Sequence, residues 1–406
     1  MTCDHCARSI EQALRALPGI EAEVDYATAS GVVRAEMLPP ADTLLARIRE
    51  LGYQATVVQE TEGDPGEQAG PTGPAGHLAI IGTGSAAFAA ALRAVERGAR
   101  VTLIERGPVI GGTCVNVGCV PSKIMIRGAH VAHLQAHHPI DGLQRCTPEV
   151  DRQAMVAQQQ ARVEELRHAK YESILEQHPE IELLRGHARF LDPHTLQVER
   201  EGEPGQTLKA DAYLIATGAR PALPDIPDLA DTPYWTSTEA LVAEELPEHL
   251  MVLGGSVVAL ELAQAFLRLG SRVTLLARST LLSREDPQIG AALHDILAGE
   301  GMDIRLHTVP ESVQHDGRHF RLTLPGGEVL QGDRLLVATG RRPNTDQLGL
   351  ETAGVETTRG GHIVVDDRLQ TSQPHIYAAG DCTSLPQYVY VAAAAGTRAA
   401  TNITGG

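Results

Sequence analysis

The chain is poor in several kinds of residue, and each shortage narrows the range of functions that the protein can have. Basic residues are outnumbered: 34 Lys and Arg stand against 51 Asp and Glu, so the formal net charge is −17. A nucleic-acid-binding protein needs a basic surface, so the charge argues against that class. No run of about 18 apolar residues occurs, so we predict no membrane span. Aromatic residues make up 3% of the chain, whereas its 40 glycines suit tightly packed α/β units.

Cysteine is also infrequent, with six residues in 406. A disulfide scaffold is typical of short secreted domains, and this long chain opens with no basic and apolar signal segment. We therefore expect a cytoplasmic protein, in which paired thiols are usually catalytic or bind a metal. At this length two or three domains are expected.

Composition divides the chain into three regions. Residues 1–61 combine helix and strand patterns, which predicts a small α+β domain. The helix patterns cover residues 7–17 and 42–51, and the strand pattern covers residues 31–36. Residues 62–76 are rich in Gly, Pro and polar side chains, which predicts a flexible linker. From residue 77 strands alternate with helices, which predicts an α/β fold with parallel sheets.

A glycine-rich turn follows the first strand pattern of the large region. Gly82 permits a tight turn, Gly84 lets a pyrophosphate approach the backbone, and Ala87 lets the next helix pack closely. The phosphates would lie at the helix N-terminus, where unpaired N–H groups favour anions. Glu105 ends the following strand, at the place where a carboxylate can bind ribose hydroxyls. The segment therefore predicts a dinucleotide site.

A second unit of the same kind begins at residue 251. Its turn contains Gly254, but Ser256 replaces the second motif glycine and slightly hinders a close backbone approach. In both units a later apolar run ends in Ala-Thr-Gly, which places Thr217 and Gly218 in the first unit and Gly340 in the second. Two dinucleotide units fit an enzyme that passes electrons from one cofactor to another.

The choice of nicotinamide cofactor depends on the end of a strand in the second unit. Ala277 stands where the first unit has Glu105, Arg278 follows it, and Arg284 lies close in sequence. A missing carboxylate beside an arginine favours a 2′-phosphate, hence NADPH over NADH. The alternative is that Arg278 is only a solvated surface charge.

Two cysteines lie just downstream of the first glycine-rich turn. Gly111 and Gly112 predict a tight turn, and Cys114 and Cys119 would lie at the start of a helix. A helix N-terminus lowers the pKa of a thiol and so favours the reactive thiolate. We therefore expect a redox dithiol beside a flavin. The alternative, a buried disulfide that staples a loop, fits an oxidising compartment better.

The segment around these cysteines, Gly-Gly-Thr-Cys-Val-Asn-Val-Gly-Cys-Val-Pro-Ser-Lys at residues 111–123, resembles the active-site segment of the flavin-dependent pyridine nucleotide-disulfide oxidoreductases. Its variant, which continues to Arg127, is most similar to that of mercuric reductases. Residues 371–381, which end in Gly380 and Asp381, resemble the family segment whose aspartate contacts the ribityl chain of the flavin. The resemblance covers essentially the whole chain.

This resemblance implies a domain order and a cofactor set. It implies an FAD-binding domain in two parts, residues 77–222 and 341–406, around an NAD(P)H-binding domain at residues 223–340. Both domains would be Rossmann-like. The implied FAD-binding residues are Gly82, Gly84, Ala87, Glu105, Gly112, Thr113, Thr217, Gly218, Gly380 and Asp381. The implied NADPH-binding residues are Gly254, Ser256, Arg278 and Gly340.

The resemblance also implies roles in catalysis. Cys114 would face the substrate, and Cys119 would lie against the flavin and form a charge-transfer thiolate. Lys123 matches the family lysine beside the flavin, and Glu261 matches its carboxylate partner. Tyr171 matches a tyrosine that mercuric reductases place near the metal. The implied reaction is the NADPH-dependent reduction of Hg(II) to Hg(0) through FAD and the dithiol.

The N-terminus carries a second thiol pair, Cys3 and Cys6, directly after Met-Thr. It resembles the heavy-metal-associated domain, a ferredoxin-like fold that here would lack its first strand. Two thiolates at this spacing can hold Hg(II) or Cu(I). A thioredoxin-like motif would need a preceding strand, and a zinc site would need more ligands than His5 offers. The remaining alternative is two idle surface thiols.

The resemblance further implies a homodimer formed by a C-terminal domain that does not occur in this sequence. We therefore expect a chain shortened at both ends, with apolar surface exposed near residues 388–400. Two other functions stay open. One is another flavin disulfide reductase, such as a dihydrolipoamide dehydrogenase or a glutathione reductase. The other is an inactive flavoprotein relic that sequesters metal.

Overall fold

The structure is a computed structural model, and it describes residues 76–405 except Glu201. Before residue 76 it describes residues 10–11, 13–15, 17, 20–25, 30–35, 39, 41–50, 53 and 55–57. The chain forms two compact units, residues 1–70 and 71–406. Cys3, Cys6 and the predicted linker up to residue 75 lie outside the described residues.

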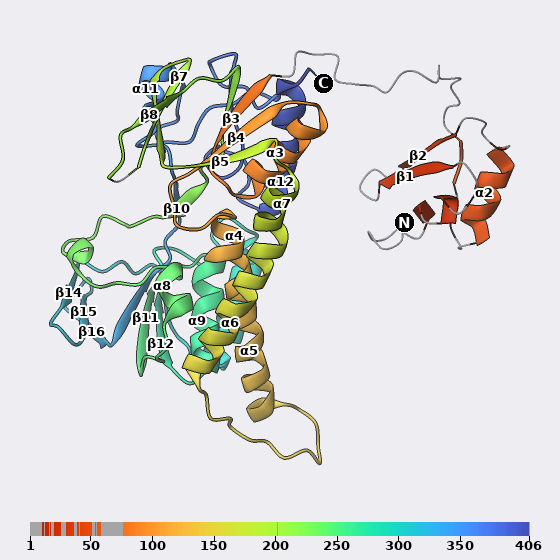
Figure 1. Cartoon of the computed structure of the whole chain (residues 1–406). Helices are drawn as coiled ribbons and strands as arrows, with labels where there is room; N and C mark the ends of the chain where they lie inside the picture. Colours follow the sequence, from red (N-terminus) through yellow and green to blue (C-terminus); the bar gives the residue numbers. More distant parts are fainter. Residues whose placement is uncertain are drawn as a thin grey trace. The chain divides into compact units, whose positions relative to one another are not determined.

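The described part of the small unit contains a hairpin and a helix. Strands β1 (Glu21–Asp25) and β2 (Ser30–Arg34) pair antiparallel, and α2 spans Ala41–Glu50 (Figure 1). Ile10, Leu14, Ile20 and Ala22 form its buried core. The sequence predicted β2 and α2 to within about two residues, but it did not predict β1.

The large unit begins with a five-stranded parallel sheet. Its order is β19-β9-β3-β4-β5. The central strand, β3, is the one that leads into the first glycine-rich turn. The strands are β3 (His77–Ile81), β4 (Arg100–Glu105), β5 (Ile181–Arg185), β9 (Ala212–Ile215) and β19 (Ile376–Ala378). Helix α3 (Ser85–Glu96) follows β3, and α12 (Val389–Ile403) packs against α3.

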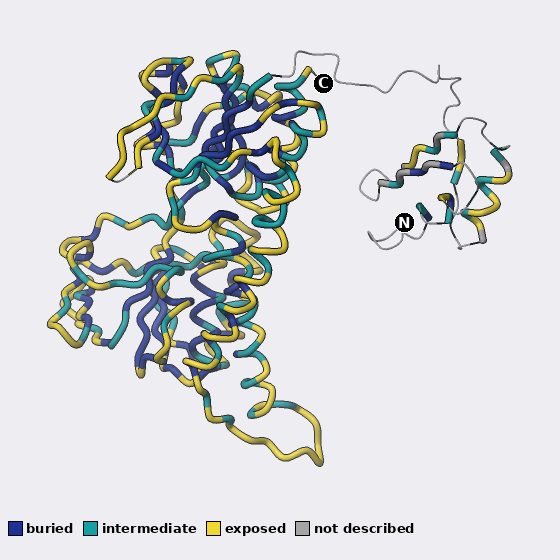
Figure 2. Tube along the Cα trace, in the orientation of Figure 1, coloured by how far each residue is buried: buried dark blue, intermediate teal, exposed yellow. Residues whose placement is uncertain are grey.

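A second parallel sheet repeats this design. Its order is β13-β12-β11-β17, with α9 (Val257–Arg268) after β11 as α3 follows β3. The strands are β11 (His249–Leu253), β12 (Arg272–Leu276), β13 (Asp303–Arg305) and β17 (Arg334–Val337). Helices α8 (Ser237–Val242) and α10 (Pro287–Gly299) complete this layer. Figure 2 shows the buried segments gathered about each sheet. The prediction of two Rossmann-like α/β domains is confirmed.

Antiparallel strands add to the two parallel sheets, and the sequence did not predict them. Three of them form one small sheet and three form another: β6 (His187–Asp192), β7 (Thr195–Glu199), β8 (Gln206–Leu208), β14 (Ser312–His315), β15 (Phe320–Thr323) and β16 (Val329–Gly332). A further pair, β10 (Ala219–Pro221) and β18 (Arg341–Pro343), lies where the chain passes between the two parallel sheets. Short elements η2 (Leu229–Asp231) and α11 (Leu350–Ala353) complete the connections.

Long helices link the two sheets. After α4 (Gly112–Asn116), helix α5 (Cys119–His137) runs beside α6 and α9 (Figure 1). Met125 and Ala129 of α5 belong to the buried core around the second sheet. Helix α6 (Arg152–Arg167) continues into the π-helix η1 (His168–Glu172) and α7 (Ser173–Gln177). In the part of the chain described, none of these helices is both long and apolar enough to cross a bilayer.

Helix α12 corrects one expectation from the sequence. Apolar surface was expected near residues 388–400, but Ala395, Gly396, Ala399 and Ala400 are buried. A Cβ on Gly396 would lie 2.0 Å from the carbonyl oxygen of Ala86, so α12 and α3 approach backbone to backbone. The large exposed apolar side chains of this stretch are those of residues 388–390.

Candidate active site

The first glycine-rich turn is built as a phosphate cradle. The Gly82 backbone has φ +112°, and a Cβ there would lie 2.4 Å from the carbonyl oxygen of Ala216. No residue except glycine fits this position without strain. Gly84 is the N-cap of α3 and offers no side chain to its first N–H groups. These donors and the helix dipole therefore remain available to an anion.

The dithiol turn touches this cradle. Gly112 has φ +65°, and a Cβ there would lie 2.6 Å from Cα of Gly84. The backbone N–H of Gly111 donates to the carbonyl oxygen of Thr83 at 3.0 Å. The segment that carries the cysteines is thus fixed directly to the predicted pyrophosphate site.

Glu105 lies at the carboxyl end of β4, as the sequence predicted. One carboxylate oxygen accepts the N–H of Gly107 at 2.6 Å, and the other accepts the hydroxyl of Thr83. The carboxylate is therefore held at the edge of the sheet beside the glycine-rich turn. This is the position from which a carboxylate can bind ribose hydroxyls.

The far end of the cradle contains a buried hydroxyl and a half-buried carboxyl. Thr217 Oγ1 is buried without a hydrogen-bond partner among the described residues. Gly218 has φ +65° and open space around its Cβ position. Burial raises the pKa of Asp381, and the nearby Arg341 opposes that rise. A buried hydroxyl without a hydrogen-bond partner and a half-buried carboxyl beside a phosphate cradle fit a flavin dinucleotide.

Arg341 belongs to this site, and the sequence reasoning missed it. Its Nε lies 3.7 Å from Oδ2 of Asp381 and has no hydrogen-bond partner among the described residues. Its Nη2 donates to the carbonyl oxygen of Ala219, across the β10–β18 pair. The one signal in the sequence was its position directly after Gly340.

The two cysteines lie together at the start of two helices. Cys114 is half-buried in α4, and Cys119 is the exposed first residue of α5. A hydrogen bond from Cys114, opposed by burial, lowers the pKa of Cys119 to about 6. The same hydrogen bond and burial raise the pKa of Cys114. At neutral pH the pair therefore holds one thiolate, on Cys119, and one proton, on Cys114.

Lys123 lies one turn beyond Cys119 on α5 and pairs with Glu261 of α9. Its Nζ donates to both carboxylate oxygens, at 2.8 and 2.7 Å. The Lys123 charge lowers the pKa of Cys119, and the Glu261 charge raises it. This exposed ion pair joins the redox helix to the second dinucleotide unit.

Tyr171 lies against the dithiol turn. A Cβ on Gly111 would be 3.1 Å from the Tyr171 ring, and that ring meets Phe88 of α3 edge-on at 4.9 Å between centroids. Burial raises the pKa of Tyr171, although a hydrogen bond with Ser85 opposes this. The phenol therefore stays protonated at neutral pH, close to both cysteines.

The second glycine-rich turn has the same backbone as the first. Gly254 has φ +133°, and a Cβ there would lie 2.3 Å from the carbonyl oxygen of Ala338. Ser256 is the N-cap of α9, and its hydroxyl donates to the Ala338 carbonyl at 3.0 Å. The Ser256 hydroxyl is thus bonded to the protein backbone and does not project into the space above the turn.

Ala277 is buried at the end of β12, and Arg278 beyond it is exposed. Arg284 is exposed as well. A small apolar residue followed by an exposed arginine places no negative charge here that would repel a 2′-phosphate. Elsewhere in the described part of the chain, no group of three His, Cys, Asp or Glu side chains is arranged to hold a metal.

Comparisons with known proteins agree with this geometry. Residues 76–396 match the family described as pyridine nucleotide-disulphide oxidoreductase, and residues 1–54 match the heavy-metal-associated domain. The chain is 55% identical to the mercuric reductase of Shigella flexneri over 427 aligned residues, which cover 100% of this chain and 75% of that protein. It is 53% identical to the mercuric reductase of Acidithiobacillus ferrooxidans, covering 100% of this chain and 73% of that protein.

A solved structure shows the same fold. The Cu(II) complex of the HOCl-induced flavoprotein disulfide reductase RclA from Escherichia coli superimposes with a TM-score of 0.73 at 33% identity. The match covers 82% of this chain and 71% of that one.

Proposed function

The chain belongs to the pyridine nucleotide-disulphide oxidoreductase family and, within it, to the mercuric reductases, and we propose that it reduces Hg(II) to Hg(0) with electrons from NADPH. Overall, NADPH and Hg(II) give NADP⁺, a proton and Hg(0). The observation that carries the proposal is the Cys114–Cys119 pair, in which one thiol donates to one thiolate beside a dinucleotide cradle.

The two cysteines supply the metal ligands. Hg(II) is a soft cation that prefers thiolate sulfur. Cys119 already carries the charge, so it is the first ligand to bind. Cys114 must lose its proton as its sulfur bonds to the metal, and its raised pKa means that the metal itself has to displace that proton. The protonated Tyr171 next to both sulfurs would line the approach of the metal.

The residues of the first unit fit FAD. The turn from Gly82 to Gly84 would hold the pyrophosphate at the start of α3, and Glu105 would hold a ribose. Asp381, Thr217 and Arg341 would contact the rest of the flavin nucleotide. When bound, the flavin supplies a two-electron carrier between the nicotinamide and the dithiol. Lys123 and Glu261 fix the redox helix at the junction of the two units.

NADPH is the nicotinamide cofactor that the second unit favours. Ala277 stands where the first unit has Glu105, so no carboxylate is present there to repel a 2′-phosphate. The exposed Arg278 can pair with that phosphate. Cys3 and Cys6 would bind the same soft cation and deliver it to the dithiol. A reducing compartment such as the cytoplasm keeps both thiol pairs active.

The test is turnover by the purified chain. NADPH oxidation is followed at increasing Hg(II) in excess thiol, together with the release of mercury vapour. We expect turnover that depends on Hg(II), and its loss in Cys114→Ala and in Cys119→Ala. Cys146→Ser, at an exposed thiol outside the site, serves as the control.

The same preparation is offered lipoamide and glutathione disulfide. Preferred turnover of either disulfide would favour the other reductases of the family. Flavin reduction without turnover of any substrate would favour a metal-sequestering relic.

A further inference from the structure

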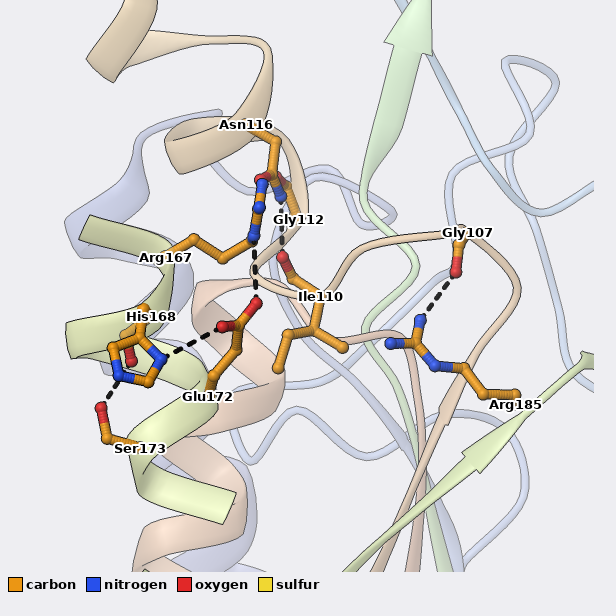
Figure 3. A network of polar contacts seen from close by, with 9 residues as sticks. All are labelled: Gly107, Ile110, Gly112, Asn116, Arg167, His168, Glu172, Ser173 and Arg185. Carbon is orange, nitrogen blue, oxygen red and sulfur yellow. Dashed lines mark hydrogen bonds and ion pairs between the residues drawn. The ribbon is translucent and has the colours of Figure 1, made fainter. Parts of the chain in front are cut away.

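The segment that carries Tyr171 is tied to the dithiol turn by a chain of polar contacts (Figure 3). The contacts join α4, the end of α6 and the π-helix η1, elements separated by about fifty residues in sequence. We propose that Asn116, Arg167 and Glu172 form a positioning network that holds Tyr171 in place relative to Cys114. The inference rests on the proposed function, because it assigns Tyr171 to the approach of the metal.

Asn116 closes the turn that carries Cys114. Its Nδ2 donates to the carbonyl oxygens of Ile110 at 2.8 Å and of Gly112 at 2.9 Å. Between these carbonyls lies Gly111, with φ +98°, followed by Gly112 with φ +65°. The amide thus brackets two consecutive residues with positive φ, a conformation that glycine adopts without strain. Cys114 lies inside this closed loop.

Arg167 connects the loop to the end of α6. Its Nη1 donates to Oδ1 of Asn116 at 3.2 Å, and its Nε donates to Oε1 of Glu172 at 3.1 Å. The Arg167 side chain is only 18% exposed, so both contacts are partly shielded from water. Two separate nitrogen atoms of one planar group make these contacts, and a lysine has only one nitrogen to offer.

Glu172 braces the π-helix from its last residue. Its second carboxylate oxygen lies 3.3 Å from Nδ1 of His168, the first residue of η1. Ser173 Oγ also donates to the carbonyl oxygen of His168. A π-helix turn is wider than an α-helix turn and is frequent at functional sites. Both ends of the wide turn are therefore held, with Tyr171 between them.

The consequence is a fixed distance between two groups on separate elements. Tyr171 packs against Phe88 and the Gly111 backbone from η1, and Cys114 is presented from α4. Arg167 is the direct side-chain link that joins η1 to α4 in this network. Without it, each element still folds, but their spacing is set only by the ring packing on Phe88 and by the hydrogen bond between Tyr171 and Ser85. Misplacement by about 1 Å can cost a reaction about 100-fold.

The chain provides a matched control on the same helix. Arg162 and Glu165 of α6 form an ion pair at 2.5 Å, and both side chains are 62% exposed. Exposed pairs of this kind contribute little to stability. Arg162→Met therefore removes an arginine and an ion pair from α6 without touching the network.

The test compares Arg167→Met with Arg162→Met in the full chain loaded with FAD. We expect Arg167→Met to lower kcat for Hg(II) by about 10-fold or more, with the rate of flavin reduction by NADPH unchanged. Arg167→Lys should recover part of the loss, and Glu172→Leu, which keeps the approximate size of the side chain but has no acceptor oxygen, should resemble Arg167→Met. Arg162→Met should behave as the unmodified chain. Equal losses in the two Met variants would overturn the proposal.

A double-mutant cycle separates positioning from a general loss of structure. If Arg167 acts through Tyr171, adding Arg167→Met to Tyr171→Phe should cost nothing further in kcat. If instead the two losses multiply, the network does not work through Tyr171.

A readout without mercury separates this proposal from the proposed function. With Cys119→Ser in both chains, so that its thiolate does not react first, the rate at which iodoacetamide alkylates Cys114 should rise when Arg167→Met is added, because the loop around Cys114 loosens. An unchanged alkylation rate overturns the network whatever the substrate is. A raised alkylation rate, where the unmodified chain never reduces Hg(II), would leave the network standing and remove the proposed function.

Discussion

At the scale of single residues, the two cysteines of the dithiol differ because one donates a hydrogen bond to the other. That bond is the largest cause of the lowered pKa of Cys119, at about 6. The thiolate is therefore present above this pH and is lost as the pH falls through it. A charge-transfer band between the Cys119 thiolate and the flavin should follow the same curve in an absorbance titration.

Removing the donor should move that curve. In Cys114→Ala the Cys119 thiolate loses its hydrogen bond, so its pKa rises and the midpoint of the band shifts to higher pH. Cys119→Ser should abolish the band, and Cys146→Ser should leave it unchanged. A band that survives in Cys119→Ser and disappears in Cys114→Ser would show that the two roles are reversed.

A second prediction at this scale concerns Arg278. The buried Ala277 offers no carboxylate, so discrimination between NADPH and NADH depends on the exposed arginine beside it. Arg278→Glu should narrow or invert the preference for NADPH in the rate of flavin reduction, because a carboxylate repels the 2′-phosphate. The matched control is Arg318→Glu, at an exposed arginine on the β14–β15 turn. If the ratio of the two rates is the same in Arg278→Glu as in the control, Arg278 is only a surface charge.

At the scale of elements, the contact between α12 and α3 depends on one glycine. A Cβ on Gly396 would lie 2.0 Å from a backbone carbonyl oxygen of α3, which cannot move away as a side chain could. Gly396→Ala should therefore destabilise the large unit by about 1–3 kcal/mol. Gly299→Ala is the control, because nothing lies within 4 Å of its Cβ position at the end of α10. It should be neutral or stabilising by up to about 1 kcal/mol. Thermal unfolding of both variants measures the difference, and equal midpoints would contradict the close approach.

Local rules explain what the sequence could predict. Gly82 and Gly254 follow apolar strands and have the positive φ values that their turns require, so both parallel units were visible in advance. The β6–β8 and β14–β16 sheets were missed, because their short strands have no pattern as distinct as a glycine-rich turn. The π-helix at Tyr171 was also invisible. Its local contacts join residues four or five apart, as in an ordinary α-helix, and the contact of Arg167 with Asn116 comes from a residue distant in sequence.

The residues of the candidate site likewise fall into those that the sequence could identify and those that it could not. Residues with a motif, such as Cys119 and Glu261, could be named from the sequence, and the structure brings Glu261 to Lys123. Arg341 could not, because its importance arises from the pairing of β10 with β18, which places it beside Asp381. A contact between strands distant in sequence leaves no local pattern to read.

At the scale of the whole molecule, the boundary between the two dinucleotide units does not follow the order of the chain. Helix α5 begins with Cys119 at the first unit, yet its Met125 and Ala129 are buried in the core of the second. The Lys123–Glu261 ion pair reinforces this connection. Cys119 is therefore anchored, through α5, in the unit proposed to bind NADPH.

The N-terminal unit is a separate compact unit, and we expect it to act separately as well. The described residues of the proposed active site all belong to the unit that spans residues 71–406. Deletion of residues 1–70 should therefore leave the visible flavin spectrum and the rate of flavin reduction by NADPH unchanged. Hg(II) turnover should fall mainly when competing thiols are abundant, since only then does capture by Cys3 and Cys6 limit the rate. The double variant Cys3→Ser with Cys6→Ser, in the full chain, should reproduce this defect without removing the domain. If the deletion slows flavin reduction, the N-terminal unit contributes to the electron path, and its role as a separate metal-capturing module would have to be abandoned.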